Sequence, residues 1–121
     1  MAIDWDRIQH FRRHEFGESG DIEPDADLVR LLDEARHYAG IPFVINSAIR
    51  TPERNTAVGG APTSAHLSGH AVDIRAPTGR HRYKILEAAL MVGFRRVGIG
   101  QGFVHLDTDP AKAQDVIWLY D

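Results

Sequence analysis

Two short stretches, Ser64-Ala65-His66-Leu67-Ser68-Gly69-His70-Ala71-Val72-Asp73 and Phe103-Val104-His105-Leu106-Asp107, carry most of the information in this sequence. His66 lies seven residues before Asp73, and His105 follows about thirty residues later. Two imidazoles and one carboxylate suit Zn²⁺ and leave a fourth coordination position for water. An open position is typical of catalytic zinc sites, so the pattern predicts zinc chemistry.

The setting of Asp73 supports this prediction. Asp73 lies between Val72 and Ile74 in an apolar run that is typical of a buried strand. A buried carboxylate costs free energy unless something pairs with it. A metal ion is one candidate partner, and Arg75, two residues away, is the other.

The second stretch is expected to be a strand with one polar face. Alternate side chains of a strand share a face, so Phe103, His105 and Asp107 should point the same way. His70 is a weaker ligand candidate: it has a zinc-like spacing from His66, but Gly69 interrupts any helix there. The remaining histidines lie in charge-rich stretches and are interpreted as ordinary surface or core residues: His10, His14, His37 and His81.

Size and composition narrow the class of protein. The 121 residues fit a single domain over 1–121 that can bury a core. The absence of cysteine excludes disulfides, cysteine-ligated zinc and a thiol nucleophile. A net charge of −3 gives no electrostatic case for a nucleic-acid partner or an anionic membrane. No apolar stretch approaches the roughly 20 residues that a membrane-spanning helix needs.

The N-terminus lacks the basic and apolar regions of a secretory signal peptide. We therefore expect synthesis in the cytoplasm, unless another factor releases the protein. A monomer is expected.

Hydrophobic periodicity predicts an α+β fold in which helices pack on a mostly antiparallel sheet. Asp21 to Asp25 indicate a turn. The expected helices cover residues 4–16, about 28–38, 52–57 after a Thr51 N-cap, and about 80–92. The expected strands cover residues 43–49, 71–74, 97–99, 103–106 and 116–120.

The combined motifs resemble the zinc D-Ala-D-Ala metallopeptidases, which share a fold with the hedgehog signalling domain. The similarity is greatest to the small single-domain branch found in phages and bacterial envelopes. It rests on His66-x-x-Gly69-x-Ala71-x-Asp73, on Phe103-Val104-His105-x-Asp107-Thr108, and on the segments Ser47–Glu53, Val58–Pro62 and Gly98–Gly100.

This resemblance implies one zinc ion per chain, held by His66, Asp73 and His105, beside a substrate groove on one face of the sheet. Arg50 matches a family arginine that projects toward the groove, where it would bind a carboxylate or polarise the scissile carbonyl; the alternative is a surface charge. Ser64 would contact substrate or orient its loop.

One position departs from the family. Several branches have an acidic general base three residues before the last histidine, where this chain has Gly102. The neighbouring Gln101 cannot ionise and would at most orient substrate. Asp107 is the remaining carboxylate on the expected metal face, either as the base or as a partner that orients His105.

The resemblance therefore implies a zinc-dependent peptidase that hydrolyses a D-Ala-D-Ala bond or another stem-peptide or cross-link amide of peptidoglycan, of the carboxypeptidase or endolysin type. Such a protein would act at the cell wall if it is released during phage lysis or carried on a virion. Gly102 keeps a second hypothesis open, a non-catalytic zinc-binding module used for cell-wall binding or virion assembly. A third is a metal-free binding domain in which His66 pairs only with Asp73.

Overall fold

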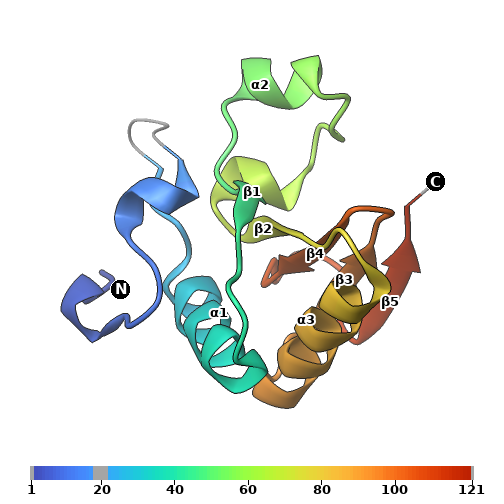
Figure 1. The fold of residues 1–121 in the computed structure, drawn as a ribbon. Helices are drawn as coiled ribbons and strands as arrows, with labels where there is room; N and C mark the ends of the chain where they lie inside the picture. Colours follow the sequence, from blue (N-terminus) through green and yellow to red (C-terminus); the bar gives the residue numbers. More distant parts are fainter. Residues whose placement is uncertain (1, 18–21, 121) are drawn as a thin grey trace.

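A five-stranded sheet forms the centre of the computed structural model, which describes residues 2–17 and 22–120 (Figure 1). The strands are β1 (Ile45–Ser47), β2 (Ala71–Arg75), β3 (Arg96–Ile99), β4 (Phe103–Asp107) and β5 (Val116–Leu119). Their order across the sheet is β1-β2-β4-β3-β5. Only the pairing of β3 with β5 is parallel, which confirms the predicted α+β class with a mostly antiparallel sheet.

Two long helices pack against each other and cover one face of the sheet: α1 (Ala26–Ala39) and α3 (Gly79–Val92). Asp25 caps α1 by accepting a hydrogen bond from the Leu28 amide, and Thr78 caps α3 in the same way. The two helices end at Gly40 and Gly93, which both adopt the left-handed backbone conformation.

The alternation of side chains along β2 and β4 divides the sheet into an apolar and a polar face. Val72 and Ile74 of β2, with Val104 and Leu106 of β4, are fully buried in the core cluster beneath the helices. The intervening polar residues of both strands therefore face away from the helices, where the chain builds a pocket.

The prediction of one helix over residues 4–16 is wrong. Two short 3₁₀ turns form instead, η1 (Trp5–Arg7) and η2 (Arg13–Phe16). The reason lies in α1, where the Asp33 carboxylate accepts hydrogen bonds from the backbone amides of Gln9 and His10. A continuous helix would use these amides internally.

The predicted strand over residues 43–49 is shorter than expected, since only Ile45–Ser47 pairs with β2. The backbone then leaves the sheet, because the Ile49 amide donates to Phe16 and the Arg50 amide donates to the carbonyl of His66. This second bond joins Arg50 directly to the segment that carries His66.

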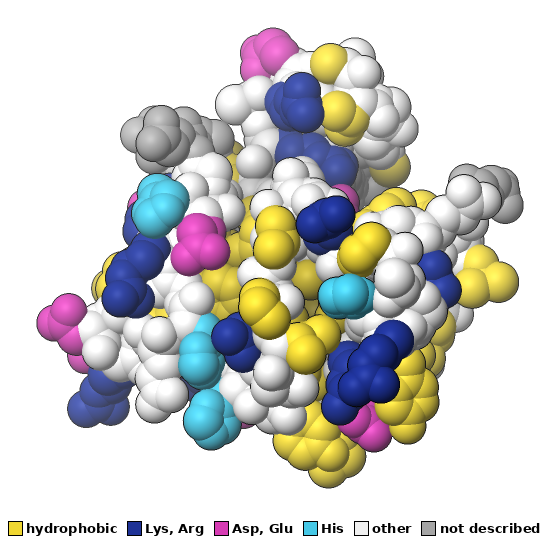
Figure 2. Space-filling model, viewed as in Figure 1, with side chains coloured by type: hydrophobic (Ala, Val, Ile, Leu, Met, Phe, Trp, Pro, Cys, Tyr) yellow, Lys and Arg dark blue, Asp and Glu magenta, His cyan; other side chains and the backbone are white. Residues whose placement is uncertain are grey.

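A short helix, α2 (Pro52–Ala57), and a 3₁₀ turn, η3 (Ala65–Ser68), connect β1 to β2. Thr51 caps α2 as predicted. The α2 helix and its flanking loops stand out from the rest of the surface (Figure 2). Gly69 ends η3 at φ +76°, and a β-carbon there would lie 2.5 Å from the Glu23 carbonyl oxygen, so this turn requires glycine.

The predicted turn at 21–25 is described from residue 22 onward, and Asp21 lies outside the described residues. Within the described part of the chain, no helix has both the length and the apolar character needed to cross a membrane.

Candidate metal centre and groove

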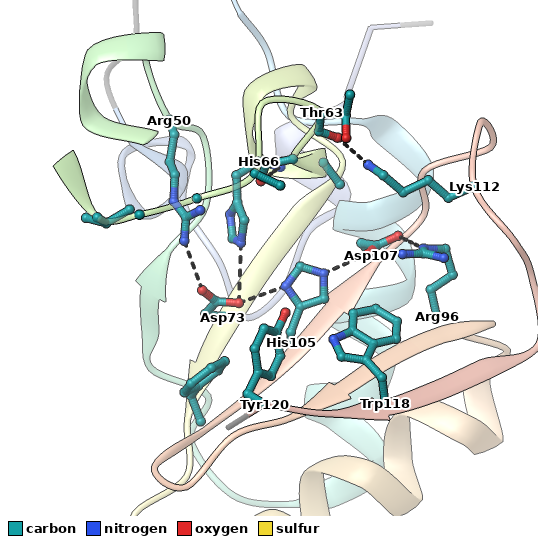
Figure 3. Close-up of a pocket in the computed structure, with 17 residues that line it drawn as sticks. Arg50, Thr63, His66, Asp73, Arg96, His105, Asp107, Lys112, Trp118 and Tyr120 are labelled. Carbon is teal, nitrogen blue, oxygen red and sulfur yellow. Dashed lines mark hydrogen bonds and ion pairs between the residues drawn. The ribbon is translucent and has the colours of Figure 1, made fainter. Parts of the chain in front are cut away.

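A pocket of about 440 Å³ lies on the polar face of the sheet (Figure 3). Side chains of β2 and β4 form its floor, and the segment between α2 and η3 forms one wall. Trp118 and Tyr120, at the C-terminal end of the chain, form the opposite wall.

The strand register brings the predicted ligands together on this floor. Asp73 is the direct partner of His105 across β2 and β4, and His66 enters from η3. Asp73 Oδ1 lies 3.3 Å from His66 Nε2 and 2.9 Å from His105 Nδ1. Donor atoms of the three residues all lie within 4.8 Å of one another. Ligands around a tetrahedral zinc with bonds of 2.0–2.1 Å lie roughly 3.3 Å apart, so the residues fit this metal.

The outer nitrogen of each imidazole has a partner that only accepts hydrogen bonds. His66 Nδ1 lies 2.7 Å from the carbonyl oxygen of Ala48, and His105 Nε2 lies 2.6 Å from Asp107 Oδ2. Each outer nitrogen can therefore donate to the acceptor behind it. With the proton of a neutral ring on that nitrogen, His66 Nε2 and His105 Nδ1 would be free to ligate a metal; without a metal, both contact the Asp73 carboxylate.

Two carboxylates make the His105 site favourable for positive charge. Burial alone would lower the pKa of His105, but hydrogen bonds to Asp107 and Asp73 raise it above its usual value. Burial would likewise raise the pKa of Asp73, but hydrogen bonds from His105 and His66 hold it well below its usual range. The floor is thus built for a cation.

Both carboxylate oxygens of Asp107 accept hydrogen bonds. Its Oδ2 accepts from His105, while Oδ1 accepts from Arg96 Nε at 2.7 Å and from the Asp109 amide at 3.1 Å. Burial would raise the pKa of Asp107, but these hydrogen bonds lower it. The predicted shared face of Phe103, His105 and Asp107 is present, and Asp107 contacts the far side of the His105 ring.

Arg50 lines the pocket and contacts the same carboxylate as the histidines. Its Nη2 lies 3.3 Å from Asp73 Oδ2, and its Nε and Nη1 donate to Ser47 and Asn55. The Arg50 side chain therefore holds the outer oxygen of Asp73 and leaves Oδ1 to the histidines. The rival partner Arg75 is exposed at the end of β2.

Of the other candidate site residues, Ser64 lines the pocket, whereas Gln101 and His70 do not. Ser64 lines the pocket and caps η3 by accepting from the His66 amide at 3.2 Å. Gln101 does not line the pocket; it is exposed in the turn between β3 and β4, where its carbonyl accepts from Arg82. His70 lies outside the ligand cluster, 3.7 Å from Asp25.

Sequence reasoning missed an aromatic wall beside His105. The ring of Trp118 lies 5.4 Å from that of His105, and Tyr120 lies 6.2 Å from it. Gly98, opposite both His105 and Trp118, makes room for them, because a β-carbon there would lie 2.7 Å from Trp118 Nε1 and 2.5 Å from Tyr120. Trp118 and Tyr120 are two residues apart within the predicted strand 116–120, and this spacing is the signal that would have indicated a shared face.

Arg96 and Lys112 were also missed. Arg96 is a charged residue at the start of a buried strand, which is the same signal that singled out Asp73. Its guanidinium lies 4.9 Å from the Trp118 ring centre and supports the aromatic wall.

Comparison with known proteins agrees with this geometry. The family model described as Peptidase M15 matches residues 9–107. The chain belongs to the peptidase M15 family. This confirms the resemblance to the zinc D-Ala-D-Ala metallopeptidases, and the family is zinc-dependent.

A solved structure of the M15 type supports the same assignment. The L-Ala D-Glu endopeptidase ChiX of Serratia marcescens matches this M15 chain with a TM-score of 0.52 and 25% sequence identity, over 71% of this chain and 80% of ChiX. The comparison with curated proteins found no match.

Proposed function

We propose that this M15 chain is a zinc-dependent peptidase that cleaves an amide bond in the stem peptides or cross-links of peptidoglycan. The observation that carries the proposal is the convergence of His66 Nε2, His105 Nδ1 and Asp73 Oδ1, with a hydrogen-bond acceptor behind each imidazole ring. Family membership and the likeness to an endopeptidase support a peptide substrate.

His66, Asp73 and His105 would hold the zinc ion. When bound in an open site, zinc lowers the pKa of water toward neutrality and polarises a carbonyl oxygen. The chain's own residues then set the geometry: the Ala48 carbonyl fixes His66, Asp107 fixes His105, and Arg50 fixes Asp73.

Arg50 has a second role in the proposed function, which is to bind substrate. Three of its hydrogen bonds go to Ser47, Asn55 and Asp73, and a guanidinium has five N–H donors. The remaining donors are available in the pocket for a substrate carbonyl or carboxylate. Arg50 thus positions a ligand and binds substrate, while Ser64 positions the loop of His66.

The contacts of Asp107 favour positioning of His105 over general-base catalysis. Arg96, His105 and the Asp109 amide occupy both of its oxygens. A general base must accept a proton from the attacking water, and a carboxylate held by three donors is poorly disposed to do so.

The same observation favours a second candidate, a non-catalytic zinc-binding module. Among the described residues that line the pocket, Asp73 and Asp107 are the carboxylates, and both are engaged. Gly102, where relatives carry an acidic residue, lies in the turn between β3 and β4 and does not line the pocket.

Digestion of purified peptidoglycan separates the two functions. The peptidase should release new amino groups, and mass analysis of the muropeptides should show D-Ala-D-Ala or another stem-peptide amide cut, with the glycan intact. Chelation should abolish the release and added Zn²⁺ should restore it. Zinc-loaded protein that leaves peptidoglycans of several chemotypes uncut, while an active relative cuts them, would exclude the peptidase.

A further inference from the structure

One end of the pocket is bridged by a lysine. Lys112, from the loop between β4 and β5, extends toward the wall formed by the segment before η3, and its Nζ donates to the Thr63 carbonyl at 2.5 Å. Both residues line the pocket. Figure 3 shows this bridge beyond Asp107, on the opposite side of His66 from Arg50. The β4–β5 loop and the segment before η3 are therefore joined at this end of the pocket.

The Lys112 ammonium group has protein hydrogen-bond partners for two of its three N–H donors. Its Nζ also donates to Asp109 Oδ2 at 2.6 Å. An ammonium has three N–H donors, so two protein contacts leave one for a ligand. Asp109 is itself buried and accepts from the Ala111 amide, which holds the lysine's partner in place. Lys112 thus offers a fixed donor with positive charge.

The neighbouring cation is more deeply buried. Arg96 donates to Asp107 and to the Ala113 carbonyl and packs against Trp118. The Arg96 side chain is 11% exposed and that of Lys112 is 27% exposed, so Lys112 is the more accessible of the two cations at this end of the pocket. Arg50 serves the other end.

We propose that Lys112 binds a carboxylate of the substrate at this closed end and thereby selects peptides that terminate shortly after the scissile bond. The inference rests on the proposed peptidase function and deepens it, because it favours release of a short, carboxylate-bearing fragment. A longer chain continuing in this direction would have to displace Lys112 from Thr63.

The test compares two stem peptides that differ only in the last group, a free C-terminal carboxylate or a C-terminal amide. The variant Lys112→Met removes the ammonium, and Lys112→Arg retains the positive charge. Lys84, on α3 and outside the pocket, is the chain's other lysine, so Lys84→Met is the matched control. Dissociation constants are measured by calorimetry on chelated protein, and kcat and KM on zinc-loaded protein.

A charge-assisted hydrogen bond corresponds to a change of roughly 10-fold or more in affinity. Wild type and Lys84→Met should bind the carboxylate peptide about 10-fold more tightly than the amide. Lys112→Met should lose this preference through a raised KM, with kcat nearly unchanged, and Lys112→Arg should recover part of it. Equal affinity of wild type for both peptides, or an equal loss on both in Lys112→Met, would overturn the proposal.

A spectroscopic readout covers the case in which Lys112→Met fails to fold. Wild-type protein grown with ¹³Cε-lysine has two side-chain signals, which Lys84→Met assigns. The carboxylate peptide should shift the Lys112 signal and the amide peptide should not; the reverse result, or no shift with either, contradicts the role. A protein that shows this binding preference but cuts nothing refutes the peptidase function and retains the Lys112 site.

Discussion

Replacing Arg96 by methionine should destabilise the protein far more than the same change at the neighbouring Arg95. Arg96 and Asp107 form a buried ion pair, with side chains 11% and 1% exposed. Arg95 forms an equally short pair with Asp115, but those side chains are 56% and 72% exposed. The two adjacent arginines thus provide a matched comparison of one interaction in two environments.

The expected magnitude follows from burial. Removal of Arg96 takes away the ion-pair partner of the buried Asp107 carboxylate, which keeps hydrogen bonds from His105 and the Asp109 amide. Breaking a buried pair in this way costs up to ~3–5 kcal/mol of the free energy of unfolding. With an unfolding entropy of ~2.1 cal/mol/K per residue, a chain of 121 residues should lose ~12–20 °C in Tm. Arg95→Met should change Tm little, because an exposed pair is screened by water and salt.

The assay is thermal unfolding of chelated protein followed by circular dichroism, so that zinc does not contribute. Adding Asp107→Asn to Arg96→Met removes the unpaired charge and should recover part of the lost stability. If Arg96→Met and Arg95→Met lose equal stability, the burial argument fails. If the double variant is less stable than Arg96→Met alone, the cost does not arise from the unpaired charge of Asp107.

Three further predictions concern the pocket. Purified protein should carry about one Zn²⁺ per chain by elemental analysis, and His66→Ala or His105→Ala should each lose most of it; full retention by both would remove the proposed site. Asp107→Asn should weaken zinc binding ~10–100-fold in a competition titration if Asp107 orients His105, whereas normal zinc with ~10²–10⁴-fold slower turnover would make it the base. Gly98→Ala should displace the aromatic wall, so its main effect should be a raised KM in peptide hydrolysis and its smaller effect a lowered Tm. An unchanged KM would show that the wall does not contact substrate.

Local patterns were sufficient to predict most of the elements. The apolar periodicity of α1 and α3 predicts both helices within two residues. The pattern fails at residues 4–16 because Asp33, far along the chain, takes the backbone amides that a helix needs. Local propensity contains no information on that competing acceptor.

The residue types of the site were also predictable. Two features stand out, because burial of such groups requires partners. One is the Asp73 carboxylate inside an apolar strand, and the other is His105, two residues from Asp107 on a later strand. Their partners were less visible. Arg96 contacts Asp107 because the register of β3 and β4 sets the two residues opposite each other. Lys112 contacts Asp109 and Thr63 through loops, and neither the register nor the course of these loops is encoded in residue spacing.

The sequence by itself determined the chemistry available: His66, Asp73 and His105 as donors, a mostly antiparallel α+β fold, and an alternation that separates polar from apolar faces. Tertiary structure alone decided the register that sets Asp73 opposite His105, and the placement of Asp107 behind the His105 ring. The physical reason is distance along the chain. Propensity and periodicity act over a few residues, whereas these contacts join strands and loops whose approach depends on packing of the whole core.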